Sequence, residues 1–179
     1  MNNNLQTPGD SLEELTIKLK NEDSNYAKIS KSFQIMYWVF IPVYLLLSIF
    51  ELKETGDINY IFSGICYAVS FLVFALVFRN YYREYITVNY SLPTLEMLKK
   101  AALRYKLFRL KTLWIVAALL FLDAGLCFNT NSYFNVLKIQ ALYMGSLLLG
   151  VIAGLIVWRI KYKPLRDNLL SMVSEIEKI

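Results

Sequence analysis

Four long apolar runs constrain this chain more than any other feature of its sequence. They comprise residues 33–50, 58–78, 112–128 and 139–158. As helices these runs would be roughly 25 to 32 Å long, which matches a hydrocarbon core about 30 Å thick. Helices of soluble proteins rarely stay apolar on every face over such a length. The sequence therefore predicts an all-α, polytopic membrane protein with four transmembrane helices.

The residue composition agrees with this interpretation and argues against several kinds of enzyme. Charged residues make up 18% of the chain, below the roughly 25% of a typical soluble domain. The chain contains no histidine, so zinc hydrolases, haem proteins and enzymes with a Ser-His-Asp triad would lack their usual side chains. We therefore predict a non-enzymatic protein without catalytic residues, bound metal or cofactor.

The two cysteines, Cys66 and Cys127, both lie inside apolar runs, and neither belongs to a CxxC pair. This spacing indicates neither a disulfide framework nor a structural zinc site. We expect two buried thiols. Thiol sensing is a further hypothesis for them, although no neighbouring feature of the sequence lowers the pKa of either thiol.

Lysine and arginine are concentrated in three segments, residues 1–32, 79–111 and 159–179, and only Lys53 and Lys138 lie elsewhere. The positive-inside rule places these three segments, and hence both termini, in the cytoplasm. The three tryptophans lie near the predicted cytoplasmic ends of the spans, as in an aromatic belt. The first span should remain in the mature protein, because the polar segment before it does not resemble a cleaved signal.

The N-terminal cytoplasmic segment contains a predicted amphipathic helix. A capping-box pattern that begins at Ser11 predicts the start of a short helix. Leu12, Leu15 and Leu19 then recur on one helical face. This face either packs against the protein's own cytoplasmic segments or binds a helix of a partner protein.

The C-terminal segment has a second amphipathic pattern, which begins after Pro164. Leu165, Leu169 and Val173 share a narrow arc, with acidic and hydroxyl side chains opposite. Because the polar face is not strongly basic, a protein helix is a better partner for this segment than anionic lipid. Packing within the protein is the alternative here as well.

The central segment, residues 79–111, should extend the second span and then turn at Pro93 into another amphipathic helix that can continue into the third span. Each pair of spans is thus followed by a proline and an amphipathic helix. Bases interleaved with tyrosines also suit single-stranded nucleic acid. Beside a membrane, however, the positive-inside bias and attraction to anionic lipid explain the same composition, so we expect no nucleic-acid binding.

Within the predicted spans, Asp123 is the single acidic residue, and it lies near the outer end of the third span. An ionisable residue at such a position is a candidate for proton or cation transport, with Lys138 as a plausible countercharge. The alternative is a structural carboxylate that is hydrated or hydrogen-bonded by Asn129 or Tyr143.

Small residues recur in the fourth span at Ser146, Gly150 and Gly154. The last two form a GxxxG pattern, which allows close approach of another helix. We expect this face to contact the first or second span, and a homo-oligomer interface is the alternative.

Three further segments carry a resemblance to a protein family: NEDSNYAKISKSF (residues 21–33), YSLPTLEMLKKAA (90–102) and YKPLRDN (162–168). In these segments the chain resembles small, largely uncharacterised four-span inner-membrane proteins of Bacteroidota. Such proteins are often encoded beside extracytoplasmic-function sigma factors. The resemblance implies a multi-pass protein of the bacterial inner membrane with an anti-sigma or accessory role.

Two functional hypotheses follow. The first is a membrane-anchored regulator or scaffold whose cytoplasmic leucine stripes bind a cytoplasmic protein, with a sigma factor as the partner that the resemblance implies. The second is a small transporter that uses Asp123. In both hypotheses, the protein is embedded in the lipid bilayer.

Overall fold

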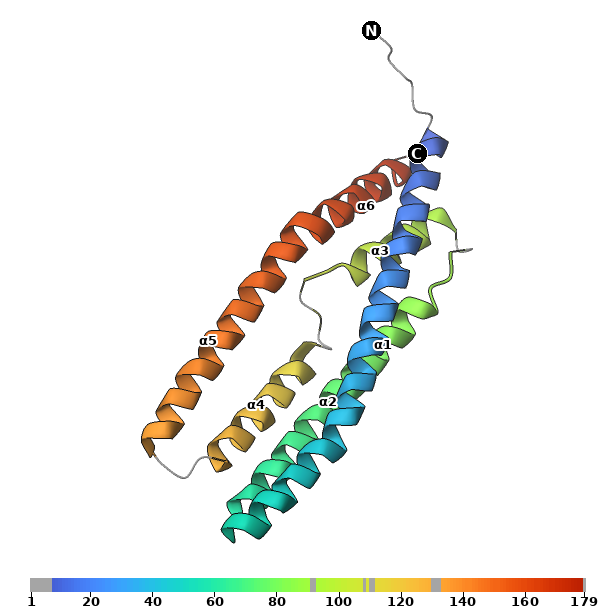
Figure 1. Cartoon of the computed structure of the whole chain (residues 1–179). Helices are drawn as coiled ribbons and strands as arrows, with labels where there is room; N and C mark the ends of the chain where they lie inside the picture. Colours follow the sequence, from blue (N-terminus) through green and yellow to red (C-terminus); the bar gives the residue numbers. More distant parts are fainter. Residues whose placement is uncertain (1–7, 91–92, 108, 110–111, 130–132, 179) are drawn as a thin grey trace.

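The computed structural model describes residues 8–90, 93–107, 109, 112–129 and 133–178, and the side chains at 8–12 and 133–134 lie outside this description. Within these ranges the regular structure is entirely helical (Figure 1). Its elements in chain order are α1 (Pro8–Thr55), α2 (Asn59–Ile86), α3 (Thr94–Arg104), α4 (Leu113–Phe128), α5 (Tyr133–Val157), a π-helical turn η2 (Trp158–Tyr162) and α6 (Lys163–Ile176).

The helices form two antiparallel hairpins. α1 packs along α2, α2 also packs against α4, and α4 is joined by a short connection to α5. Because both hairpins turn at the same end, the beginning of α1 and the end of α6 lie together at the opposite end (Figure 1). We call these the loop end and the cap end. α1, α2 and α5 are long and apolar enough to cross a membrane, whereas α4 is a shorter apolar helix.

α1 is one continuous helix of 48 residues, in place of the short helix and separate first span that the sequence predicts. It begins at Pro8, ahead of the expected cap at Ser11. No glycine or proline occurs between Asp10 and Ile41, so nothing in the backbone chemistry ends the helix there. At about 72 Å, α1 is more than twice as long as a bilayer core is thick.

α3 does not continue into α4, contrary to the sequence-based expectation. It ends at Arg104, and the backbone carbonyl of Tyr105 accepts a hydrogen bond of 3.1 Å from the indole Nε1–H of Trp158. A continuing helix would offer that carbonyl to the N–H four residues later. The contact with Trp158 therefore helps to end α3 and ties it to the end of α5.

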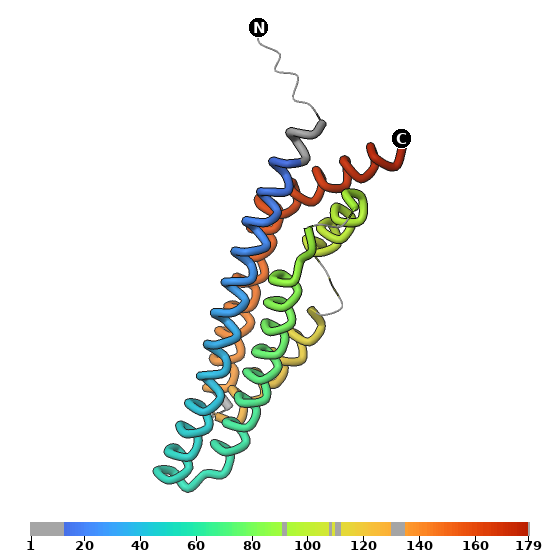
Figure 2. Tube along the Cα trace, turned by 90° about the vertical axis from the view of Figure 1, so that its right-hand side faces the viewer, coloured from blue at the N-terminus to red at the C-terminus, as the bar shows by residue number. Residues whose placement is uncertain are grey.

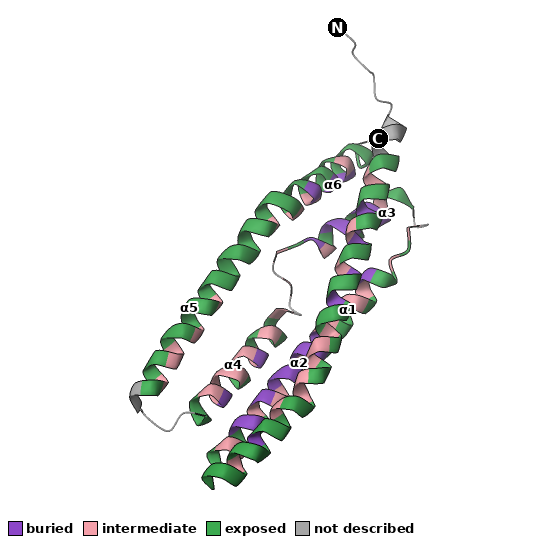
Figure 3. Ribbon diagram, in the orientation of Figure 1, coloured by how far each residue is buried: buried purple, intermediate pink, exposed green. Residues whose placement is uncertain are grey.

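An aromatic core joins α1, α2 and α4. Its buried members are Tyr67, Phe71, Phe74 and Ala118. The ring of Tyr37 on α1 stacks on Phe74, with 5.0 Å between ring centroids. α5 contributes no residue to this core, and Figure 3 shows only exposed and intermediate residues along its described length.

The turn η2 redirects the chain between α5 and α6. π-helical turns commonly bend a helix, and here α6 leaves the direction of α5 to lie across α3 (Figure 2). The last helix is thereby placed over the cap end of the molecule.

Candidate functional site

The cap is the part of the molecule formed by the N-terminal portion of α1 together with α3 and α6. These segments share a core that is distinct from the aromatic core described above. Its buried residues are Leu19, Met97, Leu98, Ala101, Ala102, Tyr105, Leu165, Leu169 and Val173. The amphipathic faces of three helices that are far apart in the sequence therefore cover one another.

The leucine stripes proposed as partner-binding faces lie in this core. Leu19 and Leu169 are fully buried, Leu165 and Val173 are nearly so, and Leu15 packs against the core. The side chain of Leu12 lies outside the described residues. The sequence left two interpretations open, packing within the protein and binding of a partner helix. The structure shows these residues packed within the protein.

A polar cluster lies within the cap around Asp23, which is 1% exposed. Its Oδ1 accepts a hydrogen bond of 2.7 Å from the hydroxyl of Tyr105. Its Oδ2 accepts bonds of 2.7 Å from the hydroxyl of Tyr90 and 2.8 Å from the guanidinium of Arg104. The carboxylate thus joins α1 to α3 and to the chain on either side of α3. The three donors use most of the carboxylate's capacity to accept hydrogen bonds.

Tyrosine rings surround this cluster. Tyr26 stacks on Tyr85 at 4.8 Å between centroids, and Tyr105 stacks on Tyr162 at 5.8 Å. Burial, reinforced by Asp23, raises the pKa of Tyr90 and Tyr105 well above the usual value, and burial also raises the pKa of Tyr26 and Tyr85. These hydroxyls stay protonated at neutral pH and act as hydrogen-bond donors.

Sequence patterns did not single out Asp23, although a signal for it was present. Leu15, Leu19 and Asp23 follow one another at intervals of four residues, so the acid continues the apolar stripe of α1. An acid on an apolar face needs a buried partner. The partner, Arg104, lies 81 positions away, which no local pattern reveals.

A groove of about 990 Å³ lies between the cap-end half of α5 and the facing sides of α1, α2 and α4. The part toward the loop end is lined by apolar or small residues, among them Phe33, Phe78, Ile115, Gly150, Gly154 and Leu155. The part toward the cap is lined by cations and aromatic rings, including Arg104, Lys106, Arg109, Tyr26, Tyr105 and Tyr162.

Gly150 and Gly154 do not make the predicted contact with the first or second span. A methyl group added at either position would meet no atom within 4 Å in the described structure. Both glycines line the groove instead, and Ser146, one turn earlier, is exposed. Close helix approach occurs at two other glycines, Gly64 against Ser48 and Gly125 against the ring of Tyr67.

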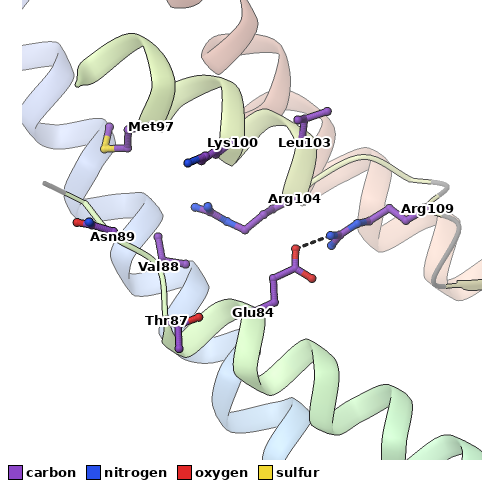
Figure 4. A pocket seen from close by; sticks show the side chains of 9 residues that line it. All are labelled: Glu84, Thr87, Val88, Asn89, Met97, Lys100, Leu103, Arg104 and Arg109. Atoms are coloured by element: carbon purple, nitrogen blue, oxygen red, sulfur yellow. Dashed lines mark hydrogen bonds and ion pairs between the residues drawn. The ribbon is translucent and has the colours of Figure 1, made fainter. Parts of the chain in front are cut away.

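A second cavity, of about 400 Å³, lies between α3 and the end of α2 (Figure 4). Lys100 and Arg104 project from α3 toward the segment after α2, and Glu84 forms an ion pair with Arg109. Arg104 and Arg109 line both this cavity and the groove. The two arginines therefore lie where the cavity and the groove adjoin.

Asp123 is hydrogen-bonded by Gln140, whose amide Nε2 lies 2.6 Å from its Oδ1. Neither of the two donors expected from the sequence, Asn129 and Tyr143, is the source of this bond. The hydroxyl of Tyr143 instead donates to the carbonyl of Leu119 at 2.8 Å. Lys138, the expected countercharge, has an exposed side chain. These polar contacts hold the loop-end part of α5 against α4.

The cysteines are separated and free. Cys66 is half-buried, whereas Cys127 is exposed and lies 3.1 Å from the amide nitrogen of Gln140. The expectation of two buried thiols is therefore wrong, because Cys127 is exposed and Cys66 is only half-buried.

Comparison of the chain with protein-family models, curated proteins and solved structures finds no match. The function is therefore argued from the geometry described above.

Proposed function

We propose that this protein is a four-span integral membrane protein with both termini in the cytoplasm, which acts as a non-enzymatic regulator or scaffold for a cytoplasmic protein. A sigma factor is the partner class that the family resemblance suggests. The inner membrane of a bacterium is the proposed location.

The cap is the observation that carries this proposal. It assembles three separated segments around its own apolar core and a buried carboxylate. Anchoring four spans alone would not require such a cap. A preassembled helical surface suits a soluble partner, because little conformational entropy is lost when that partner binds.

The structure changes which residues should contact the partner. Leu19 has no exposed surface, so a carboxylate there would disrupt the cap and would not test binding. Ile17 on α1 is 56% exposed and Leu170 on α6 is 41% exposed. These side chains are our candidates for partner contact.

The test is recovery of partners from the native host with the full chain extracted in mild detergent. We expect a cytoplasmic protein at near one-to-one ratio, lost when Ile17→Asp and Leu170→Asp are combined. Lys20→Asp, which adds the same charge at an exposed position of α1, is the matched control and should retain it. Equal recovery with both variants, or recovery of the protein alone, would contradict the proposal.

Transport through Asp123 is the second candidate. The observation that favours it is the carboxylate–amide pair of Asp123 and Gln140 between two apolar helices. In proteoliposomes, Asp123→Asn should abolish a pH- or cation-dependent flux. The control is Asp57→Asn in the loop between α1 and α2, and flux that is unchanged in Asp123→Asn removes this candidate.

A further inference from the structure

α5 is held at its two ends and left free between them. At the loop end it contacts α4 through Gln140 and Tyr143. At the cap end it continues into η2, where Trp158 bonds to Tyr105. Its most apolar stretch has no buried residue in the described structure. The groove lies along this unpacked stretch.

The chemistry of the groove changes along its length. The wall formed by Phe33, Phe78 and Ile115 faces the part of α5 that contains Gly150 and Gly154. Toward the cap, three cations line the groove, and no acidic residue is among its described lining residues. An apolar slot with a basic end is complementary to a molecule that has an apolar tail and an anionic head.

The three cations differ in how fully their charge is balanced. Arg104 is paired with Asp23 and Arg109 with Glu84. Lys106 is exposed, and its ammonium forms no ion pair with any residue that the structure describes. A net positive charge therefore remains at the basic end, centred on Lys106.

The two glycines contribute by leaving space. An added Cβ at position 150 or 154 would meet no atom within 4 Å. The two glycines therefore leave the α5 side of the groove unobstructed. From Gly150 to Tyr162 the groove extends about 18 Å along α5 and η2.

We infer that this groove binds one anionic phospholipid, with an acyl chain against Gly150 and Gly154 and its phosphate near Lys106. The inference rests on the proposed membrane location, which puts the apolar part of the groove at the depth of the acyl chains and its basic end at the cytoplasmic headgroups. Tyr and Trp side chains at that end are typical of the membrane interface. The bound lipid covers the unpacked side of α5.

Native mass spectrometry of the full chain in mild detergent tests this inference. Phosphatidylglycerol and phosphatidylcholine with identical acyl chains are titrated separately. We expect one phosphatidylglycerol per protein, bound more tightly than phosphatidylcholine. Lys106→Gln should weaken phosphatidylglycerol binding about fivefold and leave phosphatidylcholine binding unchanged, because one interfacial cation is removed. Lys20→Gln, at an exposed position of the cap, should behave as wild type.

Gly154→Leu tests the acyl-chain part of the site. The added side chain fills the groove and should weaken both lipids about tenfold, a loss equivalent to about two buried methylene groups. Gly145→Leu is the matched control, because Gly145 is also in open space but does not line the groove. Equal binding by these two variants would overturn the inference.

Three other outcomes would also overturn it. They are equal affinity for the two lipids, displacement of phosphatidylglycerol by millimolar inorganic phosphate with no effect of Gly154→Leu, and a dimer that Gly154→Leu dissociates. Resistance of the protein to alkaline extraction from membranes is measured in parallel, together with partner recovery. If the protein resists alkaline extraction and recovers its partner but does not bind phosphatidylglycerol as expected, the lipid site is rejected and the proposed function still stands.

Discussion

At the scale of single residues, Asp23 has the most consequential environment in the cap. A carboxylate with 2% of its side chain exposed is costly to desolvate, and three donors from Tyr90, Arg104 and Tyr105 offset that cost. The side chain of Arg104 is itself only 10% exposed. Each member of the pair thus depends on the other.

Asp23→Asn should therefore destabilise the cap strongly. Removing one charge of a buried pair leaves the other uncompensated, and we expect a loss of about 3 to 5 kcal/mol. Glu96→Gln, which breaks the exposed pair with Lys100, is the control and should cost about 1 kcal/mol or less. Limited proteolysis of α6 and thermal unfolding in detergent measure both. Equal stability of the two variants would show that the buried pair does not hold the cap together.

The cap tyrosines predict sensitivity to alkali. Burial raises the folded-state pKa of Tyr105 above its ordinary 10.0, so the folded chain retains this proton more tightly than the unfolded chain. The resulting stability is complete below pH 10 and is lost as the pH rises from there toward the folded-state pKa. Unfolding of the cap, followed by tyrosinate absorbance in detergent, should therefore begin above pH 10.

Tyr105→Phe separates this effect from a general response to alkali. The variant loses the hydrogen bond to Asp23 and should be less stable at pH 7, but its stability should fall less steeply above pH 10. A slope identical to that of wild type would mean that Tyr105 does not contribute to the alkaline transition.

At the scale of helices, α2 and α4 are held together by small residues and serine hydroxyls. Ser63 donates a hydrogen bond of 2.8 Å to the carbonyl of Gly125, and Ser70 donates one of 2.7 Å to that of Ala118. The two serines are seven residues apart, as are their two acceptors. Such bonds between apolar helices specify the register of an antiparallel pair.

Gly125→Ala should loosen this pair. The new Cβ would lie 2.6 Å from the ring of Tyr67, which forces the ring or the helix to move, at a cost of about 1 to 3 kcal/mol. Gly145→Ala meets nothing within 4 Å and should be neutral or stabilising by up to about 1 kcal/mol. Thermal unfolding of both variants in one detergent makes the comparison. Partial recovery in Gly125→Ala combined with Tyr67→Leu would identify the ring as the obstacle.

At the scale of the whole molecule, two regions meet around the groove. The aromatic core of α1, α2 and α4 lies toward the loop end, and the cap core lies at the cap end. α1 belongs to both cores because it is continuous from Pro8 to Thr55. The cap and the aromatic core therefore share one helix.

The proposed orientation predicts which end is reached from each side of the membrane. In a chain with Cys66→Ala and Cys127→Ser, a single cysteine is placed at Lys53 at the loop end or at Lys20 in the cap. A membrane-impermeant thiol reagent added to intact spheroplasts should label Lys53→Cys and leave Lys20→Cys unmodified until the cells are lysed. The reverse pattern would invert the topology, and labelling of both before lysis would exclude a membrane-spanning arrangement.

Amino-acid order was sufficient to locate the apolar helices and the inward face of α6, because hydrophobic periodicity is a local property of the chain. It did not identify which helices pack together. The GxxxG pattern predicted a contact for Gly150 and Gly154, yet the close contacts form at Gly64 and Gly125.

Only the tertiary structure decided where the apolar stripes of the cap are buried, what balances the charge of Asp23, and that α5 stays apart from α1 and α2. Each of these depends on segments that are far apart in the chain, such as Asp23 and Arg104 at a separation of 81 residues. A local pattern shows that a face needs a partner. The geometry of the assembled helices determines whether that partner is another part of the chain or, as we propose for the groove, a lipid.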